Sequence, residues 1–151
     1  MSAIPQFALR SARPAQQRRG SLVAELIADR AVLALLLELA AWPKPGLVSH
    51  VDSGSHTDMD AAMMQSSAYS LRPFFAELAM AGREGADMGQ LRTIGLRAEA
   101  PMLAATGGVN THRGAIFGLG LLCAAAGAVV EISAEGAAVA PVRLGQIVMQ
   151  R

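Results

Sequence analysis

The sequence predicts an all-α protein in which several helices form one bundle and two polar loops lead into helix N-termini. Hydrophobic residues make up 52% of the 151 residues but aromatic residues only 4%. The apolar residues are mainly Ala, Leu, Val and Met, which pack well between helices. No segment shows the strict alternation that is typical of a strand. A chain of this length is expected to form one domain with a real core.

The first twenty residues are basic. They hold four arginines and no acidic residue, whereas the rest of the chain has 9 basic and 12 acidic residues and a net charge of −3. Prolines interrupt any amphipathic transit helix in this segment, and no apolar signal region is present. We therefore expect residues 1–20 to be a disordered tail and residues 21–151 to be a helical domain. Because this body is not basic, nucleic-acid binding is not expected.

The first helix is expected to run from Ser21, as its N-cap, to Ala41. After Arg30 it is apolar on nearly every face, which is typical of a central core helix. Glu38 interrupts this apolar part and stands out as a carboxylate on a buried element. Prolines follow at 43 and 45, and they end the helix because the residue before a proline is pushed out of the α region.

The second helix is expected to begin with Thr57 as its N-cap and Asp60 at the third position, a variant of the capping box. It should extend to about Ala81. A kink or break is expected at Pro73, and Gly82 is expected to stop the helix.

The third helix is expected to begin at Asp87, with Gln90 three residues later, and to continue to Ala105 with a kink near Pro101. A glycine turn then leads to Thr111, which is expected to cap the next helix.

This fourth helix should cover about His112 to Val130. For the last residues of the chain we expect a turn around Gly136 to Pro141 and then a short helix.

The stretch from Gly114 to Val130 contains no charged residue, so a membrane helix is one interpretation. It falls short of the roughly 20 residues that a span needs, and its four glycines favour close packing in a buried helix. We expect no membrane contact. Cys123 is the single cysteine and cannot form an internal disulfide, which favours a reducing compartment and a cytoplasmic protein.

The run Asn110-Thr111-His112-Arg113-Gly114 places two basic side chains in the first turn of an apolar helix. Free N–H groups and the positive end of the helix dipole favour anions there. A bound phosphate would explain the basic residues. A structural ion pair of Arg113 with a carboxylate explains them equally well.

The first loop carries a lysine and several acidic residues. Lys44 lies between two prolines and could present a cation to a phosphate, although an ordinary exposed lysine is the more frequent case. Asp58 and Asp60 lie beside His56 and Asp52, and Mg²⁺ prefers one or two carboxylates together with substrate phosphates. Acidic residues at a helix start are also explained by the helix dipole alone.

Glu99 lies roughly two turns before the glycine turn and could point towards that loop. A solvated charge is the alternative interpretation.

Three runs of residues together resemble the triphosphoribosyl-dephospho-CoA synthase family. They are Pro43-Lys44-Pro45-Gly46-Leu47-Val48, Gly54-Ser55-His56-Thr57-Asp58-Met59-Asp60 and Asn110-Thr111-His112-Arg113-Gly114-Ala115-Ile116-Phe117. The likeness extends from about Leu33 to Gly127, and Glu99 matches an acidic position before the third run. Residues 48–56 are more similar to the malonate decarboxylase branch than to the citrate lyase branch.

The resemblance implies an all-helical enzyme that transfers the 5-triphosphoribosyl group of ATP to the 2′-hydroxyl of 3′-dephospho-CoA and releases adenine. The product would be the prosthetic-group precursor of the malonate decarboxylase acyl carrier protein. Because family members continue for a comparable length beyond Arg151, residues 21–151 are expected to be the N-terminal part of a catalytic domain. Such an incomplete domain would expose apolar surface, which is compatible with a homo-oligomer.

The resemblance also implies roles for individual residues. Glu99 or Asp52 would act as the catalytic carboxylate on the ribose or the acceptor, and Asp58 and Asp60 would hold Mg²⁺. Pro101 departs from the family pattern, so a shift of Glu99 is expected. The substrate-binding residues would be Lys44, His56, Asn110, Thr111, His112, Arg113 and Gly114. The alternative function is a helical nucleotide- or phosphate-binding fragment without turnover.

Overall fold

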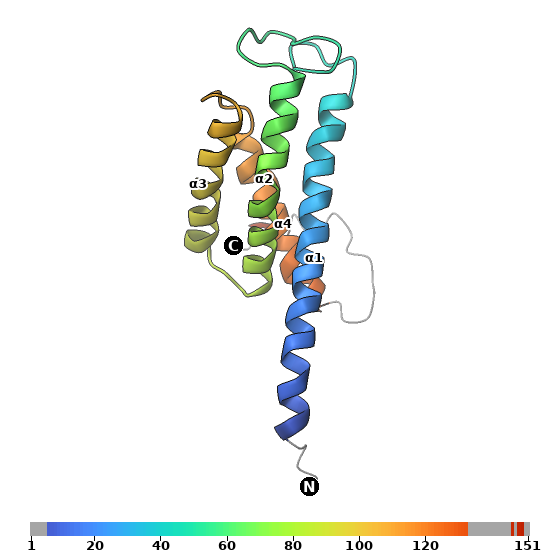
Figure 1. Cartoon of the computed structure of the whole chain (residues 1–151), viewed down its shortest axis with the longest axis vertical. Helices are drawn as coiled ribbons and strands as arrows, with labels where there is room; N and C mark the ends of the chain where they lie inside the picture. The colour runs from blue at the N-terminus through green and yellow to red at the C-terminus, as the bar shows by residue number, and fades with distance from the viewer. Residues whose placement is uncertain (1–5, 133–145, 147, 150–151) are drawn as a thin grey trace.

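The computed structural model describes residues 6–132, 146 and 148–149, and the long helices of this part form an all-α fold without strands. The helices are α1 (Gln6–Ala40), α2 (Ala61–Arg83), α3 (Met88–Ala105) and α4 (Arg113–Ile132). Figure 1 shows them as a bundle from which the N-terminal part of α1 projects. The predicted all-α fold class is confirmed.

Helix α1 begins earlier than the sequence predicts. It starts at Gln6 and continues without a break through Ser21, so residues 6–20 are helical where a disordered tail is expected. Most residues of this segment, such as Ala, Leu, Gln and Arg, have high helix propensity, which extends the helix past the predicted N-cap. The predicted end at Ala41 differs from the observed end by one residue.

Helix α2 corrects two predictions. Its N-cap is Asp60 rather than Thr57, because the Asp60 Oδ1 accepts a hydrogen bond of 2.8 Å from the backbone N–H of Met63. The helix also continues through Pro73 to Arg83, beyond the expected stop at Gly82. Leu71 and Phe75 on either side of the proline are buried in the core, and this packing keeps the helix continuous.

Helix α3 begins as predicted. The Asp87 side chain accepts from the backbone N–H of Gln90 at 2.8 Å, and the Gln90 side chain accepts from the backbone N–H of Asp87 at 2.9 Å, which completes a capping box. The helix continues through Pro101 to Ala105.

Helix α4 begins at Arg113, and the residue that caps it is not Thr111. The Asn110 Oδ1 accepts a hydrogen bond of 3.2 Å from the backbone N–H of Arg113, whereas the Thr111 hydroxyl donates to Ser67 of α2. The turn expected around Gly136 to Pro141 lies outside the described residues.

Helix α2 lies at the centre and packs against each of the other three long helices. It meets α4 with almost no side chain between the two backbones. A Cβ atom on Gly82 would lie 1.9 Å from the carbonyl oxygen of Ala124, and one on Gly127 would lie 1.9 Å from that of Ala79. Only glycine allows this approach, so these positions fix α4 against α2.

Both polar loops lie at the same end of the bundle. The first joins α1 to α2, and the second joins α3 to α4, and Figure 1 shows both at the end opposite the N-terminus. Side chains that are more than forty residues apart, such as Ser67 and His112, therefore come into contact. We call this region the loop end.

The stretch Arg113–Val130 of α4 is long and apolar enough to cross a membrane by length and composition, with a mean hydropathy of 1.8. A core helix of a soluble protein passes the same test. In this structure 39% of the stretch is buried inside the bundle, where it carries the contact with α2.

The contact between α2 and α4 can be tested with glycine substitutions in α4. Gly127→Ala should lower the free energy of unfolding by about 1–3 kcal/mol, because the methyl group forces the two backbones apart. Gly118→Ala is the matched control, since nothing lies within 4 Å of its added methyl group. The control should raise stability by about 0.5–1 kcal/mol through helix propensity. Urea unfolding followed by circular dichroism measures both, and equal effects of the two substitutions would contradict the close contact.

Candidate functional site

The first loop, Trp42 to Asp60, folds back on itself. The backbone N–H of Ser55 donates to the carbonyl of Gly46 at 3.2 Å. Gly54 has a φ of 58°, and a Cβ atom there would lie 2.5 Å from the backbone of Gly46. Any other residue at position 54 would be strained and would also clash. The two motifs within this loop, residues 43–48 and 54–60, are therefore held side by side.

Lys44 is neither a free cation nor an ordinary exposed lysine. Its Nζ donates to the Glu38 carbonyl at 2.8 Å and to the Glu38 Oε1 at 2.9 Å. The lysine side chain is only 9% exposed, whereas that of Glu38 is 52% exposed. The ion pair ties the first loop to the end of α1 and directs a half-exposed carboxylate towards the loop end.

The second loop is closed by its own backbone and by a buried threonine. The Thr106 hydroxyl lies within hydrogen-bond distance of the carbonyls of Met102 and Val109, at 3.0 and 2.5 Å. Gly107 and Gly108 have φ values of 62° and 93°, a conformation that other residues rarely adopt. This tight turn brings Asn110 to Arg113 directly to the start of α4.

His112 is buried in the bundle. Its Nδ1 lies 2.7 Å from the Ser67 Oγ, and its backbone N–H donates to the Met102 sulfur at 3.3 Å. Burial lowers the pKa of His112 from 6.5, and the negative charge of Glu38 opposes this shift. Glu38, at the end of α1, is therefore close enough to act on the charge of His112. Near neutral pH, His112 can donate a hydrogen bond but supplies no positive charge.

Arg113 forms the structural ion pair that the sequence left as an equal alternative. Its Nε donates to the Glu99 Oε2 at 3.1 Å, so Pro101 does not move Glu99 away from the loop. The Arg113 side chain is 56% exposed and that of Glu99 is 26% exposed. Among the described residues, only Glu99 is hydrogen-bonded to the Arg113 guanidinium, so the pair leaves N–H donors for an anion.

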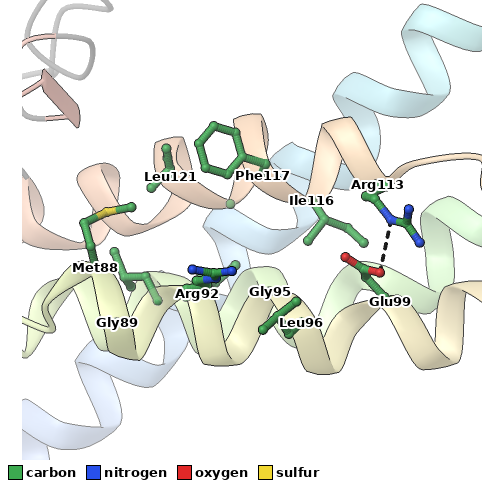
Figure 2. A pocket seen from close by; sticks show the side chains of 13 residues that line it. Met88, Gly89, Arg92, Gly95, Leu96, Glu99, Arg113, Ile116, Phe117 and Leu121 are labelled. Atoms are coloured by element: carbon green, nitrogen blue, oxygen red, sulfur yellow. Dashed lines mark hydrogen bonds and ion pairs between the residues drawn. The ribbon is translucent and has the colours of Figure 1, made fainter.

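The Glu99–Arg113 pair also lies at one end of an apolar groove between α3 and α4, as Figure 2 shows. The groove has a volume of about 620 Å³. Its apolar lining includes Leu78, Met88, Leu91, Leu96, Ile116, Phe117 and Leu121. Arg92 is the other charged residue on its wall.

The acidic residues of the first loop are partly engaged in local structure. The Asp52 Oδ1 accepts from the backbone N–H of Gly54 at 2.8 Å, and the Asp60 Oδ1 caps α2. Asp58 is 61% exposed, and its Oδ1 lies 3.7 Å from the Nδ1 of His56. Within the described part of the chain, no group of three or more His, Cys, Asp or Glu side chains is arranged for a metal ion. The free oxygens of Asp58 and Asp60 suit Mg²⁺ only together with ligands from elsewhere, such as phosphate oxygens.

Sequence reasoning missed Ser67, which links His112 and Thr111. A signal for it exists, because Ser67 precedes Leu71 by one helical turn and so occupies the core face of α2. A serine on an apolar face requires a buried partner. Cys123 is also buried, and burial raises its pKa to about 12, so its thiol is inert.

The lowered pKa of His112 predicts a dependence of stability on pH. The folded protein binds a proton at His112 less readily than the unfolded chain does. The contribution of His112 to the free energy of unfolding should therefore be constant above about pH 6.5. It should fall as the pH drops below that value, by at most about 1.4 kcal/mol per pH unit, until the folded pKa is passed.

Urea unfolding at several pH values tests this dependence. His112→Gln should make the profile flatter between about pH 6.5 and pH 5. His50→Gln serves as the control, because His50 is exposed and the pH profile should stay unchanged. An unchanged profile in His112→Gln would show that another group causes the dependence.

Comparison with known proteins gives one family. The family model for ATP:dephospho-CoA triphosphoribosyl transferase matches residues 24–146. No solved structure matches the chain.

Curated relatives agree with this match. A 2-(5''-triphosphoribosyl)-3'-dephosphocoenzyme-A synthase from Pectobacterium atrosepticum is 46% identical over 107 residues, which cover 67% of this chain and 36% of the relative. The protein of that name from Klebsiella pneumoniae is 44% identical, covering 78% of this chain and 41% of the relative. A probable one from Stutzerimonas stutzeri is 44% identical, covering 86% and 47%. The chain thus spans between about a third and a half of the length of these relatives. The match over most of its residues shows that the chain belongs to the ATP:dephospho-CoA triphosphoribosyl transferase family.

Proposed function

We propose that the loop end contributes to the transfer of the 5-triphosphoribosyl group of ATP to the 2′-hydroxyl of 3′-dephospho-CoA, with release of adenine. Family membership supplies the reaction class. The observation that carries the proposal for this chain is the position of both polar loops at the same end of the bundle. Lys44 lies there together with the neighbours His112 and Arg113, from which it is far apart in the sequence.

The triphosphate of ATP would bind mainly through Arg113 and the start of α4. The side chain of Arg113 is half exposed and keeps free N–H donors despite its pair with Glu99. The backbone N–H groups of the first turn and the positive end of the helix dipole add to this attraction. Asn110 caps this turn, Thr111 holds it against α2 and Gly114 continues it. His56 lies in the first loop.

The chemical step needs a carboxylate. The 2′-hydroxyl oxygen attacks C1′ of the ATP ribose as the bond from C1′ to the adenine nitrogen breaks. The hydroxyl proton passes to a base, and adenine leaves with a proton. The ribose carries positive charge in the transition state, which a nearby carboxylate stabilises. Glu99 is our first candidate because it lies beside Arg113, and Asp52 is the second.

Mg²⁺ would hold the triphosphate in place and neutralise part of its charge. Asp58 offers an exposed carboxylate, and Asp60 retains one oxygen that does not cap α2. We propose that these residues bind the ion together with phosphate oxygens of ATP. The sequence of residues 48–56 supports the malonate decarboxylase branch as the destination of the product. A cytoplasmic enzyme is expected from the single, buried cysteine.

Substitution of Arg113 tests whether this residue binds the substrate or forms only a structural ion pair. Arg113→Ala should lower ATP-dependent adenine release, and the affinity for ATP with Mg²⁺, by at least about tenfold. Thermal stability should change little, because an exposed ion pair contributes only about 0–1 kcal/mol. Chromatography measures the adenine, calorimetry the affinity, and circular dichroism the melting temperature.

Arg97→Ala is the matched control, since Arg97 also forms an exposed ion pair between two helices, with Glu77, but it joins α3 to α2 rather than to α4. It should leave adenine release and ATP affinity unchanged. The Klebsiella pneumoniae synthase serves as the positive control of the assay. ATP binding without adenine release from dephospho-CoA would favour a phosphate-binding module without turnover. Equal losses of binding in both arginine variants would contradict the proposed site.

A further inference from the structure

A chain of hydroxyl groups lies behind His112. Ser67 of α2 is fully buried, and its Oγ lies 2.7 Å from the His112 Nδ1. The Thr111 hydroxyl donates to the same Oγ at 2.6 Å. His112 is itself only 6% exposed, so this contact lies out of reach of a bound substrate.

The direction of these hydrogen bonds determines where the proton of His112 sits. Ser67 accepts the proton of the Thr111 hydroxyl and has one proton of its own to donate. The His112 Nδ1 is the acceptor within reach of that proton. In this arrangement Nδ1 accepts a hydrogen bond and carries no proton, which places the proton of the neutral imidazole on Nε2.

The Nε2 atom is not completely buried, although His112 as a whole is only 6% exposed. It has no hydrogen-bond partner among the described residues, and none of their side-chain nitrogen or oxygen atoms is both buried and without a partner. An Nε2–H group that reaches solvent beside Arg113 can donate to an anion bound at the start of α4. With the proton on Nδ1 instead, Nε2 would present a lone pair and repel a phosphate oxygen.

We propose that Ser67 is a positioning residue that holds His112 in its Nε2–H tautomer, so that Nε2 donates to a phosphate oxygen of the substrate. The proposal rests on the triphosphate site described above. Ser67 does not act as a nucleophile, because it has no exposed surface. Its role is to orient the donor and to prevent the tautomer that would oppose phosphate binding.

The tautomer can be measured without any ligand. Nuclear magnetic resonance of protein with ¹⁵N-labelled histidine distinguishes a protonated ring nitrogen from an unprotonated one. In the original chain, His112 should show a protonated Nε2 and an unprotonated Nδ1. Ser67→Ala should yield a mixture of both tautomers. Ser66→Ala is the matched control, because Ser66 is the exposed neighbour on the same helix and should leave the spectrum unchanged.

The affinity for inorganic tripolyphosphate tests whether Nε2 of His112 donates to a phosphate oxygen. Ser67→Ala should weaken this affinity by about threefold to tenfold, and Ser66→Ala should leave it unchanged. Combined with His112→Gln, whose side-chain amide supplies a donor that has no second tautomer, Ser67→Ala should have no further effect on affinity. Should Ser67→Ala fail to fold, Ser67→Cys replaces it, with a weaker donor and a smaller change in the same direction.

A protonated Nδ1 in the original chain would overturn the proposal, as would an unchanged tautomer and affinity in Ser67→Ala. Failure of the original chain to bind tripolyphosphate would instead overturn the proposed triphosphate site and the phosphate contact of Nε2. The ligand-free spectrum still decides the link between Ser67 and the tautomer in that case, so the two failures are distinguishable.

Discussion

The close approach of α2 and α4 is the constraint on which the loop end depends. Gly82 and Gly127 let the two backbones touch, and a single methyl group at either position would lie 1.9 Å from a carbonyl oxygen. Because no side chains lie between the backbones at these positions, α2 and α4 have little freedom to slide or rotate against each other. The start of α4 is therefore fixed against α2, and His112 meets Ser67 at 2.7 Å. The arrangement of polar residues thus follows from apolar packing at the other end of the same helices.

The two cations of the loop end are each paired with a carboxylate before any substrate binds. Lys44 is paired with Glu38, and Arg113 is paired with Glu99. Such pairs hold long side chains in one geometry, which lowers the entropy lost when an anion binds. The buried histidine adds a donor without adding charge, because burial disfavours its protonated form. A triphosphate with Mg²⁺ would then meet oriented donors rather than mobile cations.

The sequence predicted the helices better than their ends. The capping box at Asp87 and Gln90 was found because it depends only on residues three apart. No break occurs at Pro73, because the packing of Leu71 and Phe75 keeps α2 helical there. The predicted N-cap Thr57 was wrong, because Asp60, three residues later, caps the helix instead. Residues 6–20 continue α1 although local signals favour a start at Ser21.

For the candidate site, the motifs identified most of the polar residues but not their partners. Lys44, His112 and Arg113 stood out by residue type and spacing, whereas their contacts with Glu38, Ser67 and Glu99 cross from one helix or loop to another. Contacts between elements leave only weak signals in a single sequence. A serine on the core face of α2 was such a signal, and it indicated a buried partner without saying which.

The central claim is that the two polar loops form one site for the triphosphate of ATP. Titration of ¹⁵N-labelled protein with ATP and Mg²⁺, followed through the backbone amide signals, tests it most directly. Saturable shifts should appear both in Lys44 to Asp60 and in Thr106 to Gly114, with one common affinity. The turn between α2 and α3, Glu84 to Asp87 at the opposite end of the bundle, should stay unchanged. Shifts confined to one loop, or different affinities for the two loops, would contradict a shared site.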